Sequence, residues 1–169
     1  MRRRNGEPVP PEAVEALCRK EWPRLVGLLT LLVGEPFTAE ELAQEVLIRV
    51  CRDPDRILAM VAPGPWIHRV AVNLANSHFR RLSAGRRAHQ RLTLERPPDR
   101  TPNPTDGVAV RQALQALPLR QRSAIVLRYY ADLSIRDVAA TLSCPEGTVK
   151  TLIHDAIEAL RRDGLVQDT

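Results

Sequence analysis

Arginine side chains are the commonest groups in this sequence that could bind a charged ligand. The chain carries 25 basic residues, of which only Lys20 and Lys150 are lysines, and its formal net charge is +5. Six arginines and no acidic residue lie between Trp66 and Arg91. A solvated surface normally mixes both signs of charge, whereas a positive stripe neutralises phosphates and releases their counterions. We therefore predict that this segment binds nucleic acid. Its candidate contacts are Arg69, His78, Arg80 and Arg81.

The sequence lacks the patterns expected of an enzyme or a metal site. Its four histidines have neither the spacing of metal ligands nor a Ser or Cys partner, and no Gly-rich phosphate loop is present. The cysteines Cys18, Cys51 and Cys144 are far apart in sequence and lack CxxC spacing, which favours buried, reduced thiols. We expect no enzymatic activity, no metal and no cofactor.

Length and hydropathy bound the class of protein. A chain of 169 residues that is 44% hydrophobic suits one ordinary domain or two small ones. The N-terminal MRRRNGEPVPP is basic, but no continuous apolar segment follows it, so it is not a signal peptide. The longest apolar stretch, residues 25–33, is too short to span a bilayer. We expect a cytoplasmic protein without membrane insertion.

Helical periodicity follows a loose basic tail at residues 1–11. Pro23 predicts a kink or a break into two helices, and Gly34 predicts a C-terminal stop. The sequence TAEE at 38–41 matches a capping box that opens the next helix. A rigid turn, PGP at 63–65, precedes a further helix. The predicted buried faces of these two helices are Leu42, Ala43, Val46, Leu47 and Val50, and Ile67, Val70, Ala71 and Leu74.

The composition changes at residues 92–105, where prolines accumulate and helical periodicity ends. This segment predicts a linker between a first domain at 12–91 and a second at 106–169. In the second domain, SIRD at 134–137 predicts a helix N-terminus, and Pro145 suits the start of the last helix. The fold class is thus all-α: two small helical domains joined by a Pro-rich linker, the second a helix-turn-helix.

Three segments in order resemble one protein family. The C-terminal segment is ALPLRQRSAIVLRYYADLSIRDVAATLSCPEGTVKTLIHDAIEALRR, and the earlier two are ELAQEVLIRV and PWIHRVAVNLANSHFRR. They resemble the second domain, the polymerase-binding helix and the promoter-melting helix of bacterial RNA polymerase sigma factors of the extracytoplasmic-function (ECF) group. The resemblance covers roughly residues 12–91 and 106–162.

The resemblance implies a function and its residues. Such a protein binds core RNA polymerase and directs recognition and opening of promoter DNA, and an anti-sigma factor commonly holds it inactive. The first domain would bind polymerase and the minus-ten element, with Asn73 holding a flipped base. The second would bind the minus-thirty-five element. The implied polymerase contacts are Glu41, Leu42, Gln44, Glu45 and Arg49.

The last helix departs from the family pattern. Its first two turns keep groups for reading DNA, but Asp155 and Glu158 replace arginines that are frequent in the family. The phosphate contacts then fall partly on the preceding helices. The candidate minus-thirty-five contacts are Arg120, Arg122, Arg136, Thr148, Lys150, Thr151 and His154.

Other interpretations remain open from sequence. The chain could be a sigma-like regulator whose apolar flank on the last helix mainly binds another protein, such as an anti-sigma factor. The last helix could also be only core, without a role in DNA binding. A plain helix-turn-helix transcriptional regulator would explain the second domain, but it would leave the polymerase-docking helix and the arginines of the first without a purpose.

Overall fold

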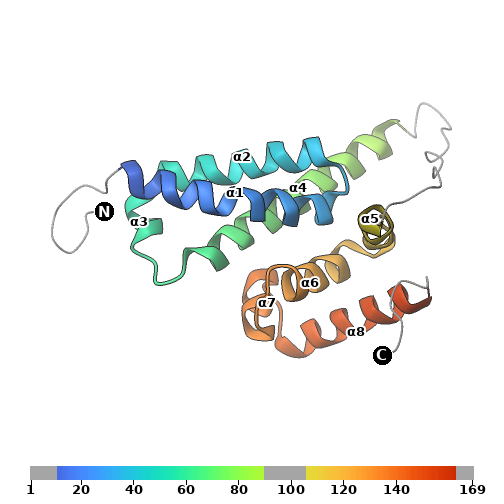
Figure 1. Ribbon diagram of the computed structural model, residues 1–169. Helices are drawn as coiled ribbons and strands as arrows, with labels where there is room; N and C mark the ends of the chain where they lie inside the picture. Colours follow the sequence, from blue (N-terminus) through green and yellow to red (C-terminus); the bar gives the residue numbers. More distant parts are fainter. Residues whose placement is uncertain (1–10, 90–105, 163–169) are drawn as a thin grey trace.

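The chain folds into helices, as its periodicity predicts. The computed structural model describes residues 11–89 and 106–162, which form eight helices and no strand (Figure 1). The predicted linker at 92–105, and all but the last residue of the predicted tail at 1–11, lie outside the described residues. Within the described part, no helix combines the length and hydropathy that crossing a bilayer requires. The helices are α1 (Pro11–Val33), α2 (Pro36–Arg52), α3 (Pro54–Leu58), α4 (Pro63–His89), α5 (Asp106–Ala116), α6 (Leu119–Tyr129), α7 (Ile135–Leu142) and α8 (Glu146–Arg162).

The first domain packs the long helices α1, α2 and α4 against one another, with the short α3 at one end (Figure 1). The predicted buried face of α4 is confirmed, since Ile67, Val70, Ala71 and Leu74 are all buried. Pro23 lies inside α1 and does not divide it, so the predicted break into two helices is wrong. Pro23 is exposed, on the side of α1 away from the buried leucines of this helix.

The N-terminus of α2 differs from the predicted capping box. The helix begins at Pro36, and Glu35 is the N-cap residue. Its carboxylate accepts hydrogen bonds from the backbone N–H groups of Phe37 at 2.9 Å and Thr38 at 2.6 Å. These hydrogen bonds lower the pKa of Glu35, Thr38 contributing more than Phe37. Thr38 is therefore inside the helix, and the prediction that it caps α2 is wrong.

The second domain forms the predicted helix-turn-helix from α7 and α8. Ser134 is the N-cap of α7, and its hydroxyl oxygen accepts from the N–H of Asp137 at 3.1 Å, as predicted. Ser143 ends α7 in the left-handed conformation, with φ of 53°. Val138 of α7 and Val149 of α8 are fully buried where the two helices pack. The turn therefore fixes the last helix against the rest of the domain.

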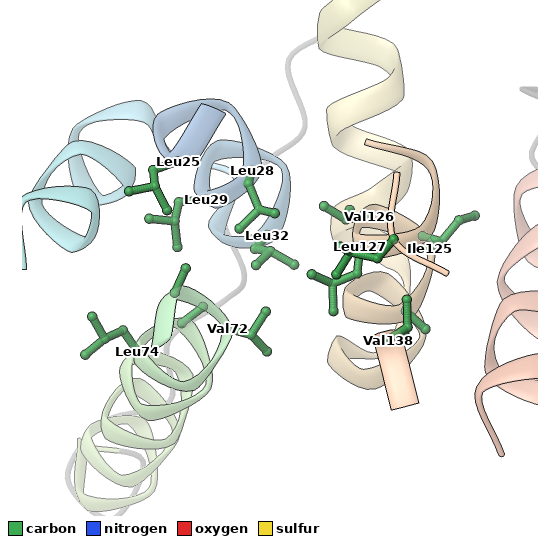
Figure 2. Packing of buried hydrophobic residues seen from close by; sticks show 14 of the residues in the cluster. Leu25, Leu28, Leu29, Leu32, Val72, Leu74, Ile125, Val126, Leu127 and Val138 are labelled. Carbon is green, nitrogen blue, oxygen red and sulfur yellow. The ribbon is translucent and has the colours of Figure 1, made fainter. Parts of the chain in front are cut away.

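The two domains share one hydrophobic core instead of lying apart. Helix α1 contacts α5 and α6, and α4 contacts α6 and α7. Figure 2 shows Leu32 of α1 between Val72 of α4 and Leu127 of α6. All three side chains are at most 1% exposed. The two domains are therefore packed together in this structure.

Arg122 of α6 is the main polar residue at this domain contact. It is only 6% exposed and donates hydrogen bonds to the carbonyl oxygens of Leu32 in α1 and of Gln115 and Leu117 in its own domain. It also donates to the side-chain oxygen of Gln115 and lies 5.4 Å from the ring centroid of Phe79 in α4. Burial lowers its pKa to about 10, so the guanidinium is still cationic at neutral pH. Arg122 therefore links α1, α4, α5 and α6.

We expect Arg122→Ala to lower the thermal stability of the chain. The backbone carbonyls of Gln115 and Leu117 would lose this donor, and Leu32 O would keep only its longer bond from Gln115. Each unsatisfied buried group costs roughly 1–3 kcal/mol. A total loss of about 3 kcal/mol corresponds to a fall of roughly 6–12 °C in the unfolding midpoint for a chain of this size. Calorimetry measures it. Arg120→Ala, an exposed arginine on the same helix, is the matched control. Equal losses in the two variants would contradict the role of Arg122.

Candidate nucleic-acid and polymerase interfaces

The exposed face of α4 carries most of the predicted minus-ten contacts. Asn73 is exposed, and Arg69 and Arg80 are exposed within about 40° of it at about 100° of helix per residue. Arg80 donates a hydrogen bond to the hydroxyl oxygen of Ser77 at 3.0 Å. Arg81 is also exposed, about 80° from Asn73. Cationic and amide groups are therefore brought together along one side of α4.

His78 does not belong to this side of α4. It lies about 140° around the helix from Asn73, it is half-buried, and its ring makes an edge contact with Phe79 at 5.7 Å between centroids. The expectation that His78 lines the arginine face is therefore wrong, because five residues along a helix reach nearly the opposite side. The side chains of the arginines beyond residue 84 in this segment lie outside the described residues.

Arg69 makes a contact that the sequence did not indicate. Its guanidinium donates to the carbonyl oxygen of Ala140, in the last turn of α7, at 2.6 Å. Helix α7 has no basic residue in its own last turn. A cation near a helix C-terminus is favourable because the last carbonyls carry partial negative charge. The minus-ten candidate thus stabilises the domain contact in this structure.

The first two turns of α8 present the predicted reading face. Thr148, Lys150, Thr151 and His154 are all exposed. The Thr151 hydroxyl donates to the carbonyl oxygen of Gly147 at 3.2 Å, which leaves its oxygen lone pairs able to accept. The opposite side of the helix is buried, at Val149, Ile153, Ala156 and Leu160, as the periodicity predicts. The interpretation of α8 as core on all sides is therefore wrong.

The two acidic residues of α8 lie on this same face. Asp155 and Glu158 are exposed, within about 40° of Thr151 on the helix. Glu158 forms an ion pair with Arg161 at 2.9 Å, and both side chains are about half exposed, at 47% and 44%. The pair offsets part of the negative charge at the C-terminal end of α8. The field that a phosphate backbone would meet is nevertheless less positive than an all-arginine face would give.

The three arginines predicted to support α8 fall into two groups. Arg120 and Arg136 are exposed and remain candidates for phosphate contacts. Arg122 is buried and its guanidinium is bonded within the protein. In this arrangement Arg122 is a structural residue and not a phosphate contact, which corrects the sequence prediction. The sequence did not distinguish it from Arg120, two positions earlier.

Helix α2 exposes all but one of the predicted polymerase contacts. Glu41, Gln44 and Arg49 are exposed, and the half-exposed Glu45 pairs with Arg49 at 2.7 Å. Leu42 is only 5% exposed and belongs to the core of the first domain, so its assignment as a surface contact is wrong. The same residue was also predicted on the buried face of α2, and that prediction is confirmed.

Two large apolar residues on α2 were missed from sequence. Phe37 is 67% exposed and Ile48 is 50% exposed. Both lie within about 40° of Glu41 and Gln44 on the helix. Both residues lie outside the buried stripe predicted for α2, and this feature of the sequence could have identified them as exposed. They give the exposed face of α2 an apolar component beside its charged groups.

A mostly apolar hollow of about 530 Å³ lies in the second domain at one end of α8, where α1 of the first domain borders it. Ile157, from the predicted apolar flanks of α8, lines it together with Leu160 from the buried side of that helix, and α1 contributes Leu31. Tyr129 and Tyr130 at the end of α6 are 64% and 46% exposed along its edge. The remaining lining residues are Val110, Leu114, Ile125, Val126 and Arg161.

The family models match both domains. The model described as Sigma-70 region 2 matches residues 17–85, and the model described as Sigma-70, region 4 matches residues 107–160. The first match contains α2 and most of α4, and the second contains the helix-turn-helix. Region 2 precedes region 4 in the chain, and neither model matches residues 86–106.

A solved structure has the same fold. It is the sigma factor RpoE in its co-crystal structure with the anti-sigma factor NepR from Bartonella quintana. The TM-score is 0.77, with coverage of 93% of this chain and 99% of that one, and the sequence identity is 21%. The likeness concerns the fold.

Sequence relatives cover most of the chain. The RNA polymerase sigma-H factor of Pseudomonas aeruginosa is 29% identical, with coverage of 88% of this chain and 84% of that protein. The ECF RNA polymerase sigma factor SigW of Bacillus subtilis is 30% identical, with coverage of 82% of both chains. SigM of Mycobacterium tuberculosis is 31% identical, with coverage of 89% and 76%. The chain belongs to the ECF family of RNA polymerase sigma factors.

Proposed function

We propose that this sigma factor uses three exposed helix faces for three separate binding functions. Helix α2 would bind core RNA polymerase, α4 would bind and open the minus-ten element, and α8 would bind the minus-thirty-five element, in the cytoplasm. The first domain, residues 12–91, and the second, residues 106–169, would act on separate parts of the promoter. A plain helix-turn-helix regulator would leave the region 2 match at 17–85 unexplained.

The observation that carries this assignment is the composition of the α4 face. Asn73 stands between the exposed arginines Arg69 and Arg80, in a segment that has no acidic residue. Arginines there would hold phosphates of the separated strand. An amide beside them can both donate to and accept from a base edge. Together, the phosphate contacts and the base contact would offset part of the stacking energy that is lost when a base is flipped out of the duplex.

The packed domains could not bind both promoter elements at once. The two elements are roughly 25 base pairs apart, or about 85 Å at 3.4 Å per step. Helix α4 packs on α7 and α7 packs on α8. Since packed helix axes lie about 8–10 Å apart, the two reading helices are separated by about 20 Å. We infer that the domains separate before the promoter is bound.

Two arginines would oppose that separation. Arg122 of the second domain donates to the last turn of α1, and Arg69 of the first domain donates to the last turn of α7. Each interaction of a cation with a helix C-terminus typically contributes about 0.3–1 kcal/mol at the surface. Opening exchanges these hydrogen bonds for water or phosphate. Polymerase binding to the opened chain would offset the remaining cost.

An anti-sigma factor is the partner we propose for the apolar hollow of the second domain that α1 borders. RpoE from Bartonella quintana, which shares the fold, was crystallised with the anti-sigma factor NepR. The exposed Tyr129 and Tyr130 beside Ile157 are the kind of residues that anchor protein interfaces. A partner that bound Leu31 of α1 and Ile157 of α8 together would stabilise the packed state. Such a partner would oppose promoter binding without touching α4 or the reading face of α8.

We expect Asn73→Ala to reduce run-off transcription by core polymerase with this chain by about tenfold. A bidentate contact between an amide and a base contributes about 1–3 kcal/mol, and 1.4 kcal/mol corresponds to a factor of ten. The loss should appear as weaker permanganate reactivity in the minus-ten region, while the affinity for core polymerase stays unchanged. Unchanged promoter opening would reject the assignment of Asn73 to the base pocket.

Replacing Asp155 by Asn should strengthen binding of the chain to a minus-thirty-five duplex by roughly 1.4- to fivefold at moderate salt. The exposed carboxylate lies on the reading face, and exposed charge interactions contribute about 0.2–1 kcal/mol. Fluorescence anisotropy with the duplex measures the change. Glu15→Gln removes the same charge from exposed α1 and serves as the control. Equal gains in both variants would show a net-charge effect and not a contact of α8.

Gln115→Ala should raise the ratio of open to packed chains about fivefold. The Gln115 amide donates to Leu31 O at 3.0 Å and to Leu32 O at 3.4 Å, both in the last turn of α1. Losing a hydrogen bond of this kind costs about 1 kcal/mol. Single-molecule energy transfer between dyes at Glu12 and Lys150 reports the ratio.

Gln112→Ala is the matched control for this variant, because Gln112 is exposed one turn earlier on α5. Its energy-transfer distribution should match that of the unmodified chain. If Gln115→Ala also leaves the distribution unchanged, Gln115 does not hold the domains together. The proposed roles of α2, α4 and α8 would not depend on that result.

A further inference from the structure

Two cysteines that are 33 positions apart in the sequence come together on the surface of the first domain. Cys18 of α1 and Cys51 of α2 line one hollow of about 540 Å³. Trp22 and Leu47 also line it, so its walls are mostly apolar. Cys51 is exposed and Cys18 is half-buried. The expectation of buried thiols is therefore wrong for Cys51. The sequence did not indicate that Cys18 and Cys51 are neighbours, because they are far apart along the chain.

The two thiols line the same hollow and are close enough for Cys51 to affect the ionisation of Cys18. Burial raises the pKa of Cys18 to about 11, and the negative charge and hydrogen bonding of Cys51 add to this effect. A charge on Cys51 therefore disfavours a second charge on Cys18, as expected for adjacent acids. The exposed sulfur of Cys51 is the one that a dissolved reagent reaches first. The pair thus has one accessible thiol and one sheltered partner.

We propose that Cys18 and Cys51 form a redox-active dithiol that a peroxide oxidises reversibly to an intramolecular disulfide. The thiolate of Cys51 would attack one peroxide oxygen, so that the O–O bond breaks and Cys51 becomes a sulfenic acid with release of water. The sulfur of Cys18 then attacks the sulfur of Cys51. The S–S bond forms, the S–O bond breaks, and the proton of Cys18 leaves with the hydroxyl group as a second water.

The atoms and electrons of this reaction balance. Two thiols and one hydrogen peroxide give one disulfide and two waters, so the two sulfurs lose the two electrons that the peroxide oxygens gain. A small thiol reductant reverses the reaction by thiol–disulfide exchange. Cys18 is the resolving residue because its sheltered sulfur meets Cys51 before it meets dissolved reagents. Transient disulfides of this kind are the form in which redox-sensing thiols operate in reducing compartments.

The third cysteine provides an internal comparison. Cys144 is half-buried at the turn between α7 and α8, in the other domain, and does not line this hollow. Peroxide should therefore remove two of the three thiols and spare one. A proposal that treated all three as equivalent would predict mixed products. The expected product has a single pairing.

The test is alkylation and intact-mass analysis of the folded full chain after brief exposure to hydrogen peroxide. We expect the number of alkylated cysteines under denaturing conditions to fall from three to one, with the mass of two hydrogen atoms lost before alkylation. Non-reducing peptide mapping should join the Cys18 and Cys51 peptides, and dithiothreitol should restore three thiols. Retention of three thiols, or pairing that includes Cys144, would overturn the proposal.

Single substitutions separate pairing from general oxidation. Cys144→Ser should leave the disulfide yield unchanged. Cys18→Ser should let Cys51 accumulate as sulfenic acid, which a dimedone probe traps, because the resolving thiol is gone. Cys51→Ser changes an exposed position and should fold normally, with Cys18 resistant to the same dose of peroxide. Equal oxidation of Cys18 with and without Cys51 would contradict the order of steps. None of these measurements depends on polymerase or promoter binding.

Discussion

The buried guanidinium of Arg122 constrains how the two domains pack. A guanidinium carries five N–H donors that water satisfies in the unfolded chain, so a site that excludes water must supply acceptors. Here peptide and amide oxygens, including the carbonyl of Leu32 at the end of α1, accept from the two Nη groups, while Nε is buried without a hydrogen-bond partner among the described residues. That helix has no basic residue in its own last turn. Its C-terminal partial charge is therefore complemented from the other domain, and the contact fixes α6 against α1.

Arg69 repeats this arrangement in the opposite direction. It belongs to the first domain and complements the end of α7 in the second. The Arg69 guanidinium is also a candidate phosphate ligand, and it cannot occupy both positions at once. Promoter binding and domain packing therefore compete for it. By linkage, a change that weakens the packed state without altering a DNA contact strengthens DNA binding by the same free energy, provided that DNA binds only the open state and the free chain is mostly packed.

Helices and their buried faces were predictable from sequence because periodicity is local. The N-cap of α2 was harder to predict, because the Glu35 carboxylate and the Thr38 hydroxyl can each accept from free backbone N–H groups at a helix start. These two candidates are three residues apart, and only the fold selects between them. The packing of the two domains was not predictable, because Arg122 and Gln115 donate hydrogen bonds to backbone carbonyls. Every residue has a backbone carbonyl, so the sequence does not show which ones act as acceptors. The surface roles of α2, α4 and α8 were indicated by family resemblance, while burial removed Leu42 from the proposed surface.

The acidic residues of α8 shift the balance among the interactions that open the chain. Glu158 is partly offset by Arg161 on its own helix, but Asp155 keeps a negative charge on the reading face. If α4 and α8 bind one promoter together, as proposed, α8 would contribute less free energy to that joint binding than an arginine-rich helix would. Under the proposed roles, the remainder would come from polymerase bound at α2 and from strand contacts at α4. A protein partner that stabilises the packed state would then compete with a smaller free energy of DNA binding. Modest affinity of that partner would therefore be enough to keep the domains packed.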